Sequence, residues 1–187
     1  MYKHIDHNSY SYGFTLVEFL VVIAILATIG ALTGIHLMKY GPTYELRSQA
    51  RTLYSEMQNA KISAIRSREP WGFVFDEGTN SYTIYSSSGD GDFSTTANNV
   101  IYKTFNLNQA KYTISFGHGS STAKFGGGSF GAGDNITYPD ETLAFGTIGN
   151  STQGTLYLQN NRQDTYAIGT NMFGNIFLRR WTGTGWN

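Results

Sequence analysis

The sequence contains no cysteine, only three prolines, and charged side chains at only 14% of its 187 positions. Without cysteine the chain forms no disulfide and offers no thiolate for catalysis or metal binding, and the redox compartment stays undetermined. The formal net charge is zero, so no global basic excess indicates nucleic acid as the main partner. Gly, Asn, Ser, Thr and Tyr are abundant instead, which is typical of a β-rich domain outside the cytosol.

Histidine is also scarce, and its placement argues against a catalytic or metal site. His4 and His7 lie near the N-terminus, His36 lies near the end of an apolar stretch, and only His118 lies further along the chain. A zinc site with nitrogen and sulfur ligands therefore lacks ligands, and we expect His118 to be a solvated loop side chain. We expect no enzymatic activity, no metal and no cofactor.

Two glycine-containing stretches resemble ligand-binding loops only in part. Asp90 and Asp92 supply two carboxylates, but calcium needs six to eight oxygen ligands and no further acidic residue follows within the next twenty. We therefore expect a polar turn. The glycine run at residues 126–128 lacks the Lys-Ser/Thr ending of a phosphate-binding loop.

The longest apolar run lies near the N-terminus and opens with a single carboxylate. Residues 13–18 read Gly-Phe-Thr-Leu-Val-Glu, and residues 19–38 are almost entirely apolar. At about 1.5 Å per residue, a helix over residues 14–39 would be long enough to cross a hydrocarbon core of roughly 30 Å. An acidic side chain costs roughly 2.5–3.5 kcal/mol at the centre of a membrane, so anchoring alone does not explain Glu18.

The first thirteen residues differ from an ordinary secretory signal because they are polar and lack an apolar central region. A cut after Gly13 would therefore leave the hydrophobic helix in the mature protein. An uncleaved signal anchor and an ordinary signal peptide cut near residue 30 are alternatives that stay open. A further alternative confines Glu18 to its own helix terminus, paired with Phe14 four residues earlier.

The stretch around Gly13 resembles the class III signal of type IV pilins and pseudopilins. In that family a prepilin peptidase cuts after the glycine and methylates the new N-terminal phenylalanine, and the glutamate neutralises the amino terminus of a neighbouring subunit. The resemblance therefore implies cleavage between Gly13 and Phe14, methylation of Phe14, and an assembly role for Glu18. It also implies a single-pass inner-membrane protein with a periplasmic β-domain. Its partners would be the prepilin peptidase and other pilin or pseudopilin subunits.

Beyond the apolar run, hydrophobic periodicity predicts more helix and then strands. The helix either kinks or restarts at Gly41-Pro42, and an amphipathic helix is expected over residues 43–69, ended by Pro70. Its apolar stripe comprises Leu46, Ala50, Leu53, Met57, Ala60, Ala64 and Ile65. Short aromatic and β-branched runs then predict antiparallel strands. These runs cover residues 71–75, 82–85, 100–105, 112–116, 142–145, 155–159, 166–170 and 176–181. The Gly/Ser-rich residues 117–133 are expected to form a mobile loop or hairpin tip.

The resulting order predicts an α+β fold, with a long N-terminal helix packed on an antiparallel β-domain. The expected parts are a leader (1–13), a transmembrane or filament-core helix (14–40), the amphipathic helix (43–69) and the β-domain (71–187). Within the pilin superfamily this order resembles the GspH/FimT minor pseudopilins. Residues 60–66, 143–149 and 154–158, and the terminal hairpin with Gly174 at its turn, carry that resemblance.

The terminal hairpin raises a second function. Some FimT-type pilins resemble DNA receptors, and Arg179 and Arg180 beside Trp181 could hold phosphates and stack bases. Asn175, however, stands where such members often have arginine, and residues 182–187 are uncharged. We rank a filament subunit of a type II secretion pseudopilus or type IV pilus first. A DNA-binding minor pilin for DNA uptake and a membrane-anchored β-domain that does not polymerise are the alternatives.

Processing after Gly13 has a direct signature in the mature protein. Purified protein should begin at methylated Phe14, and Gly13→Ile should keep the leader attached, because a bulky β-branched side chain would stand beside the scissile bond. Intact-mass spectrometry measures both. A mature start at Met1, or beyond residue 25, would contradict the assignment.

Overall fold

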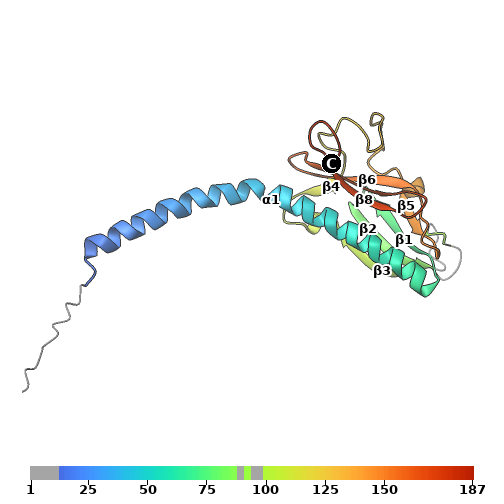
Figure 1. Ribbon diagram of the computed structural model, residues 1–187, viewed down its shortest axis with the longest axis horizontal. Helices are drawn as coiled ribbons and strands as arrows, with labels where there is room; N and C mark the ends of the chain where they lie inside the picture. Colours follow the sequence, from blue (N-terminus) through green and yellow to red (C-terminus); the bar gives the residue numbers. More distant parts are fainter. Residues whose placement is uncertain (1–12, 88–90, 94–98) are drawn as a thin grey trace, which may run out of the picture. The chain divides into compact units, whose positions relative to one another are not determined.

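The computed structural model describes residues 13–87, 91–93 and 99–187, without the side chains of residues 32–39. The chain divides into two units, Met1–Tyr40 and Gly41–Asn187. One helix, α1 (Leu16–Ser67), belongs to both units, and strands follow it (Figure 1). The leader predicted for residues 1–13 lies outside the described residues, apart from its last glycine.

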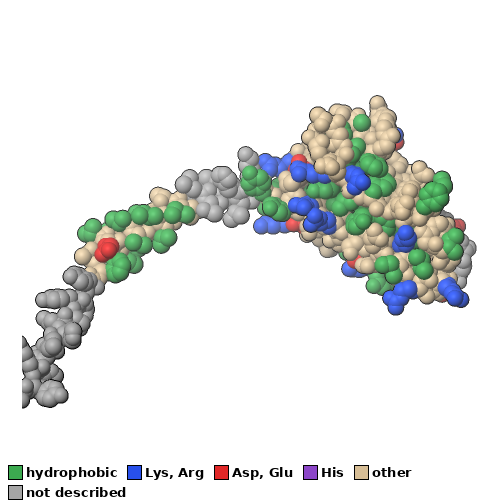
Figure 2. Space-filling view, viewed as in Figure 1, with side chains coloured by type: hydrophobic (Ala, Val, Ile, Leu, Met, Phe, Trp, Pro, Cys, Tyr) green, Lys and Arg blue, Asp and Glu red, His purple; other side chains and the backbone are tan. Residues whose placement is uncertain are grey.

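The described part of the first unit is an apolar helix with a capped start. The hydroxyl oxygen of Thr15 accepts a hydrogen bond from the backbone amide of Glu18 at 3.2 Å, which satisfies one of the amides left free at a helix start. Large apolar side chains between residues 16 and 29 are 42–80% exposed. Figure 2 shows them in green along this segment, with one acidic side chain among them. Within the described residues, no helical stretch is both long enough and apolar enough to span a bilayer.

Helix α1 continues through Gly41 and Pro42, so the predicted amphipathic helix is not a separate element. A Cβ atom at position 41 would lie 2.2 Å from the hydroxyl oxygen of Tyr112, so a larger residue there would require this tyrosine ring to move. The helix ends at Ser67, and the next residue, Arg68, has a left-handed φ of 58°. The sequence predicted a helix to residue 69, so the observed end lies two residues earlier, still before Pro70.

In the second unit, α1 buries the predicted apolar stripe. The fully buried helix side chains recur at spacings of four and three residues: Leu46, Ala50, Leu53, Met57, Ala60 and Ala64. Ile65, which was placed in the same stripe, is instead 46% exposed. The stripe prediction is therefore confirmed except at its last member.

The strands form two antiparallel sheets of four strands each. The first has the order β3-β2-β1-β5 and the second β4-β6-β7-β8. The elements are β1 (Trp71–Asp76), β2 (Ser81–Ser87), β3 (Asn99–Asn106), β4 (Ile114–Phe116), β5 (Thr142–Phe145), β6 (Gly154–Asn160), β7 (Thr165–Thr170) and β8 (Ile176–Arg180). All eight predicted strands are confirmed, with shifted ends. The division into two sheets was not predicted.

One core joins the helix and both sheets. Phe75 of β1 stacks on Tyr138 at 5.7 Å between ring centroids and meets Phe116 of β4 edge-on at 6.1 Å. Burial raises the pKa of Tyr138, whose hydroxyl group pairs with that of Thr170 at 3.1 Å. Aromatic contacts thus tie the first sheet to the second.

The glycine-rich segment at residues 117–133 is a loop, as predicted, but it is fastened to the second sheet. The amide of Phe125 donates to the hydroxyl oxygen of Tyr157 at 3.0 Å, and the amide of Gly119 donates to the side-chain oxygen of Gln159 at 2.8 Å. Tyr157 and Gln159 of β6 thus supply acceptors for two of the loop amides.

The core stripe makes a stability prediction. Leu53 is 1% exposed, so Leu53→Ala should lower the free energy of unfolding by about 2–5 kcal/mol through lost burial and a cavity. Tyr44 lies on the same helix and is 68% exposed, so Tyr44→Ala should change the free energy of unfolding by less than about 0.5 kcal/mol. Urea unfolding of a fragment spanning residues 41–187 measures both. Equal losses in the two variants would contradict the assigned core.

Candidate processing and assembly site

The bond predicted to be cut lies in an exposed, non-helical stretch. Gly13 and Phe14 precede α1, and Phe14 is 80% exposed. Apart from Gly13 and its chain neighbours, no described residue has an atom within 4 Å of the position that a Cβ would take there. A peptidase can therefore approach the peptide bond between these residues without unwinding the helix.

Glu18 lies in the first turn of α1, where the local sequence favours an acidic residue. Thr15 and Glu18 have the spacing of a capping box, and a carboxylate at a helix start interacts favourably with the helix dipole. Among the described residues no ion pair involves the Glu18 carboxylate, which lies on an exposed residue. An intrachain pair with Phe14 would need a free amino group there, which only cleavage creates.

The arginines of the terminal hairpin lie on β8, the edge strand of the second sheet. Arg180 lies 4.0 Å from the Asp164 carboxylate, and Arg179 donates to the carbonyl of Leu178 at 3.1 Å. Trp181, the aromatic neighbour, is only 8% exposed and packs edge-on against another tryptophan at 5.2 Å. Its ring is therefore not available for base stacking.

Asp164 further limits the positive charge of this hairpin. Its carboxylate accepts hydrogen bonds from the hydroxyl of Thr43 at 2.7 Å and from the amide of Asn160 at 3.0 Å. These bonds hold an anion beside Arg180 and tie the β6–β7 turn to the helix. The terminal hairpin thus carries two arginines on an edge strand, and the charge of Arg180 is partly neutralised by Asp164.

His118 lies in the loop, as expected, but it is partly buried rather than fully solvated. Its ring stacks on Phe130 with 4.0 Å between centroids, and its Nδ1 atom is buried without a hydrogen-bond partner among the described residues. The glycine-rich loop folds back so that Phe130 lies against this ring. Nearby, the Lys124 ammonium at 2.8 Å and the Gly131 amide hold the pKa of Asp134 below its usual range.

The other ligand candidates do not converge. Asp92 is exposed, and Asp90 lies outside the described residues. In the part of the chain that the structure describes, no three His, Asp or Glu side chains are grouped to hold a metal ion.

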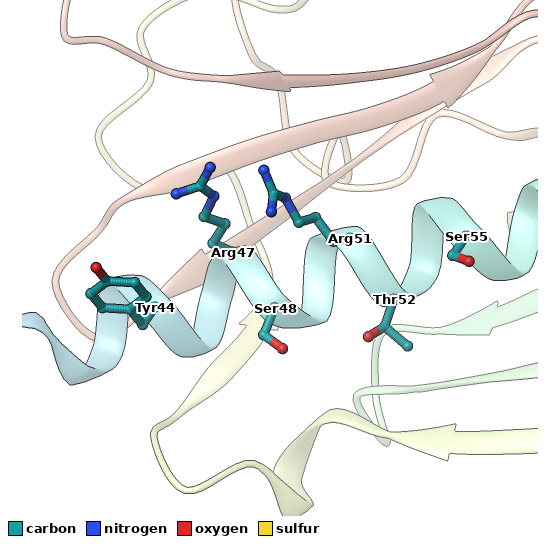
Figure 3. A pocket seen from close by; sticks show the side chains of 6 residues that line it. All are labelled: Tyr44, Arg47, Ser48, Arg51, Thr52 and Ser55. Carbon is teal, nitrogen blue, oxygen red and sulfur yellow. The ribbon is translucent and has the colours of Figure 1, made fainter.

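A hollow of about 450 Å³ on the outer face of α1 was not predicted. Its lining residues all belong to this helix: Tyr44, Arg47, Ser48, Arg51, Thr52 and Ser55. Figure 3 shows Arg47 and Arg51 on one side of the helix and Ser48 and Thr52 on the other. Since no second element closes the hollow, we assign it no ligand. The signal in the sequence is the helical spacing of hydroxyl and arginine side chains opposite the apolar stripe.

The comparisons with known proteins cover the N-terminal segment and the fold separately. Residues 8–34 match the family model of the prokaryotic N-terminal methylation motif, a span that contains Gly13, Phe14 and Glu18. No curated protein sequence matches the chain significantly.

Two minor subunits of known structure are similar to the chain. One is the minor pseudopilin EpsH from the type 2 secretion system of Vibrio cholerae, with 15% identity over 72% of this chain and 95% of that chain, at a TM-score of 0.49. The other is the type IV minor pilin FimU of Pseudomonas aeruginosa, with 14% identity over 79% of this chain and 96% of that chain, at a TM-score of 0.51. The similarity to FimU confirms the predicted α+β fold. The chain therefore joins a prokaryotic N-terminal methylation motif to the fold of a type IV minor pilin.

Proposed function

We propose that this chain is a non-enzymatic pilin-like subunit, a minor pseudopilin of a type II secretion pseudopilus or a type IV pilus. One observation carries the proposal: the methylation motif spans an exposed Gly13–Phe14 bond directly ahead of a long apolar helix. The fold of the second unit supports it, because FimU shares that fold. A prepilin peptidase would cut this bond and methylate Phe14.

Before assembly, residues 14–40 anchor the subunit in the inner membrane and the β-domain lies in the periplasm. This membrane span stays a prediction from the sequence. The exposed apolar side chains of α1 suit such a place, because an apolar helix surface of this kind is otherwise in contact with water.

Assembly through the helix needs more than apolar contact. Lipid tails are as apolar as leucine, so helices gain no hydrophobic free energy by leaving lipid for one another. Close packing and polar pairs must supply the preference. Glu18 is the one acidic side chain in residues 14–40, and a neighbour's amino terminus is a matching cation. In an apolar surrounding such a pair is strong, and either charge left alone is costly.

The two alternatives differ in measurable ways. If the chain were a membrane-anchored domain that does not polymerise, its function would not require the Glu18 carboxylate. A DNA-uptake pilin would need a basic, accessible surface, and the Arg179–Arg180 pair beside Asp164 and the buried Trp181 offers little of one.

Removing the carboxylate separates assembly from anchoring. Glu18→Val should leave membrane insertion intact or improve it, since a costly charge is lost, and should impair incorporation into filaments. Thr28→Val, which also replaces a polar side chain of the same helix with valine, is the matched control and should assemble normally. Quantitative immunoblots of membrane and sheared-filament fractions measure both. Normal incorporation of the Glu18 variant would exclude the assembly role.

A DNA-binding assay tests the second function. Residues 41–187 hold eleven basic and eleven acidic side chains, so they carry no net positive charge, and affinity for DNA comes mainly from phosphate neutralisation. The fragment of residues 41–187 should therefore bind duplex DNA with a dissociation constant on the order of 10⁻⁴ M or weaker at physiological salt. Gel retardation across a salt series measures this. Micromolar binding that is lost when Arg179 and Arg180 are both replaced by alanine would make the chain a DNA-capturing pilin.

A further inference from the structure

The exposed large apolar side chains of the second unit gather around the last turns of α1. Apart from Tyr44, those among the described residues come from the helix end, from β3 and from two neighbouring turns. We define the distal patch as Ile62, Ile65, Tyr102, Ile148, Met172 and Phe173, with exposed fractions between 46% and 86%. On the face that Figure 2 shows, green hydrophobic and blue basic side chains lie side by side where α1 ends.

Contacts join the helix end to β3. Ile62 and Tyr102 line one pocket of about 250 Å³, together with Trp71 and Arg66. The rings of Tyr102 and Trp71 meet edge-on at 5.0 Å. The indole N–H of Trp71 is buried without an acceptor among the described residues, a cost that folding alone does not explain.

The two turns of the patch are locked against each other and against the helix. Gly174 has a φ of 72°, and a Cβ there would lie 1.8 Å from the carbonyl oxygen of Gly149. The Lys61 ammonium donates to the carbonyl of Gly174 at 2.8 Å. Ile148 and Phe173, which are 86% and 75% exposed, are therefore presented by fixed turns. Because fixed side chains lose little conformational entropy on binding, such a surface suits a specific partner.

The charges that touch the patch are unbalanced. Arg66 lines the pocket and has no ion-pair partner among the described residues, and Lys61 contributes a second cation. Glu56 also lines the pocket, but its carboxylate is paired with Lys103 at 3.2 Å. A second copy docked through the same patch would bring like charges together. A different partner with carboxylates would neutralise them.

We propose that the distal patch is the docking surface for another pilin-like subunit, distinct from this chain, whose contacting surface is apolar and carries a carboxylate opposite Arg66. The kind of partner rests on the proposed function, whereas the surface rests on exposure, geometry and charge. Contiguous apolar patches that soluble domains leave exposed are typically interaction sites. Along α1, Ile65 of the patch lies about 36 Å from Gly41.

Site-specific photo-crosslinking of the full chain in its native cells tests the proposal. A benzophenone amino acid is placed at Phe173, and the matched control carries it at Tyr44, the exposed aromatic outside the patch. The Phe173 position should give an adduct with a different protein that carries an N-terminal methylation motif, and the Tyr44 position should not. Adding Arg66→Glu should lower the adduct yield at least tenfold. Adding Arg47→Glu, the charge control outside the patch, should leave the yield unchanged.

The other outcomes overturn the proposal. An adduct of this chain with itself assigns the patch to a copy, adducts with lipid alone assign it to a bilayer, and an adduct insensitive to Arg66→Glu removes the charge match. One further outcome is that the Phe173 position gives no adduct in cells where the protein still starts at methylated Phe14 and needs Glu18 for assembly. That result would exclude the docking surface but would not contradict the proposed function. A mature protein that does not start at Phe14 defeats the function itself.

Discussion

The rest of this molecule depends on one constraint: the single helix α1 has an apolar first part and an amphipathic second part, which suit two different environments. Before Tyr40, α1 is apolar on all sides, with a single carboxylate, and a helix of that kind has no face to turn toward water. After Gly41 the same helix is apolar on one stripe and polar opposite it. That stripe is buried by both sheets, so the second unit forms its core on the helix rather than beside it. The eight strands have no complete core without α1.

Electrostatics follow the same division. In residues 14–40 one carboxylate, Glu18, stands alone in apolar sequence, where its free energy depends on a partner. In the second unit the described ion pairs lie at the surface and act as local fasteners. Lys103 with Glu56 ties β3 to the helix, and Lys124 with Asp134 closes the glycine-rich loop. Surface pairs of this kind contribute only about 0–1 kcal/mol each, so the core, and not the charges, stabilises the fold.

The sequence predicted the elements well where the pattern is local. The helical spacing from Leu46 to Ala64 and the alternation in the strands both reflect burial of one face. Such burial can be recognised from residues that are close together in the sequence. The division into two sheets was not predicted, because strand order depends on which distant runs pair. The partial burial of His118 was not predicted for a related reason: glycine and serine around it indicate a loop, but the ring of Phe130 that covers it comes from twelve residues further on.

Ile65 is exposed because it directly follows Ala64, and so lies about 100° around the helix from the buried stripe. Its side chain lies instead beside the turn at Gly149. Ile62, outside the stripe, is exposed on the pocket side. An apolar side chain that the fold does not bury either stays in contact with water, at a cost in free energy, or is covered by another chain. One such residue needs no explanation, but several that meet at locked turns beside an unpaired arginine do. The interface proposed above therefore lies where the sequence supplies apolar side chains that the core does not use.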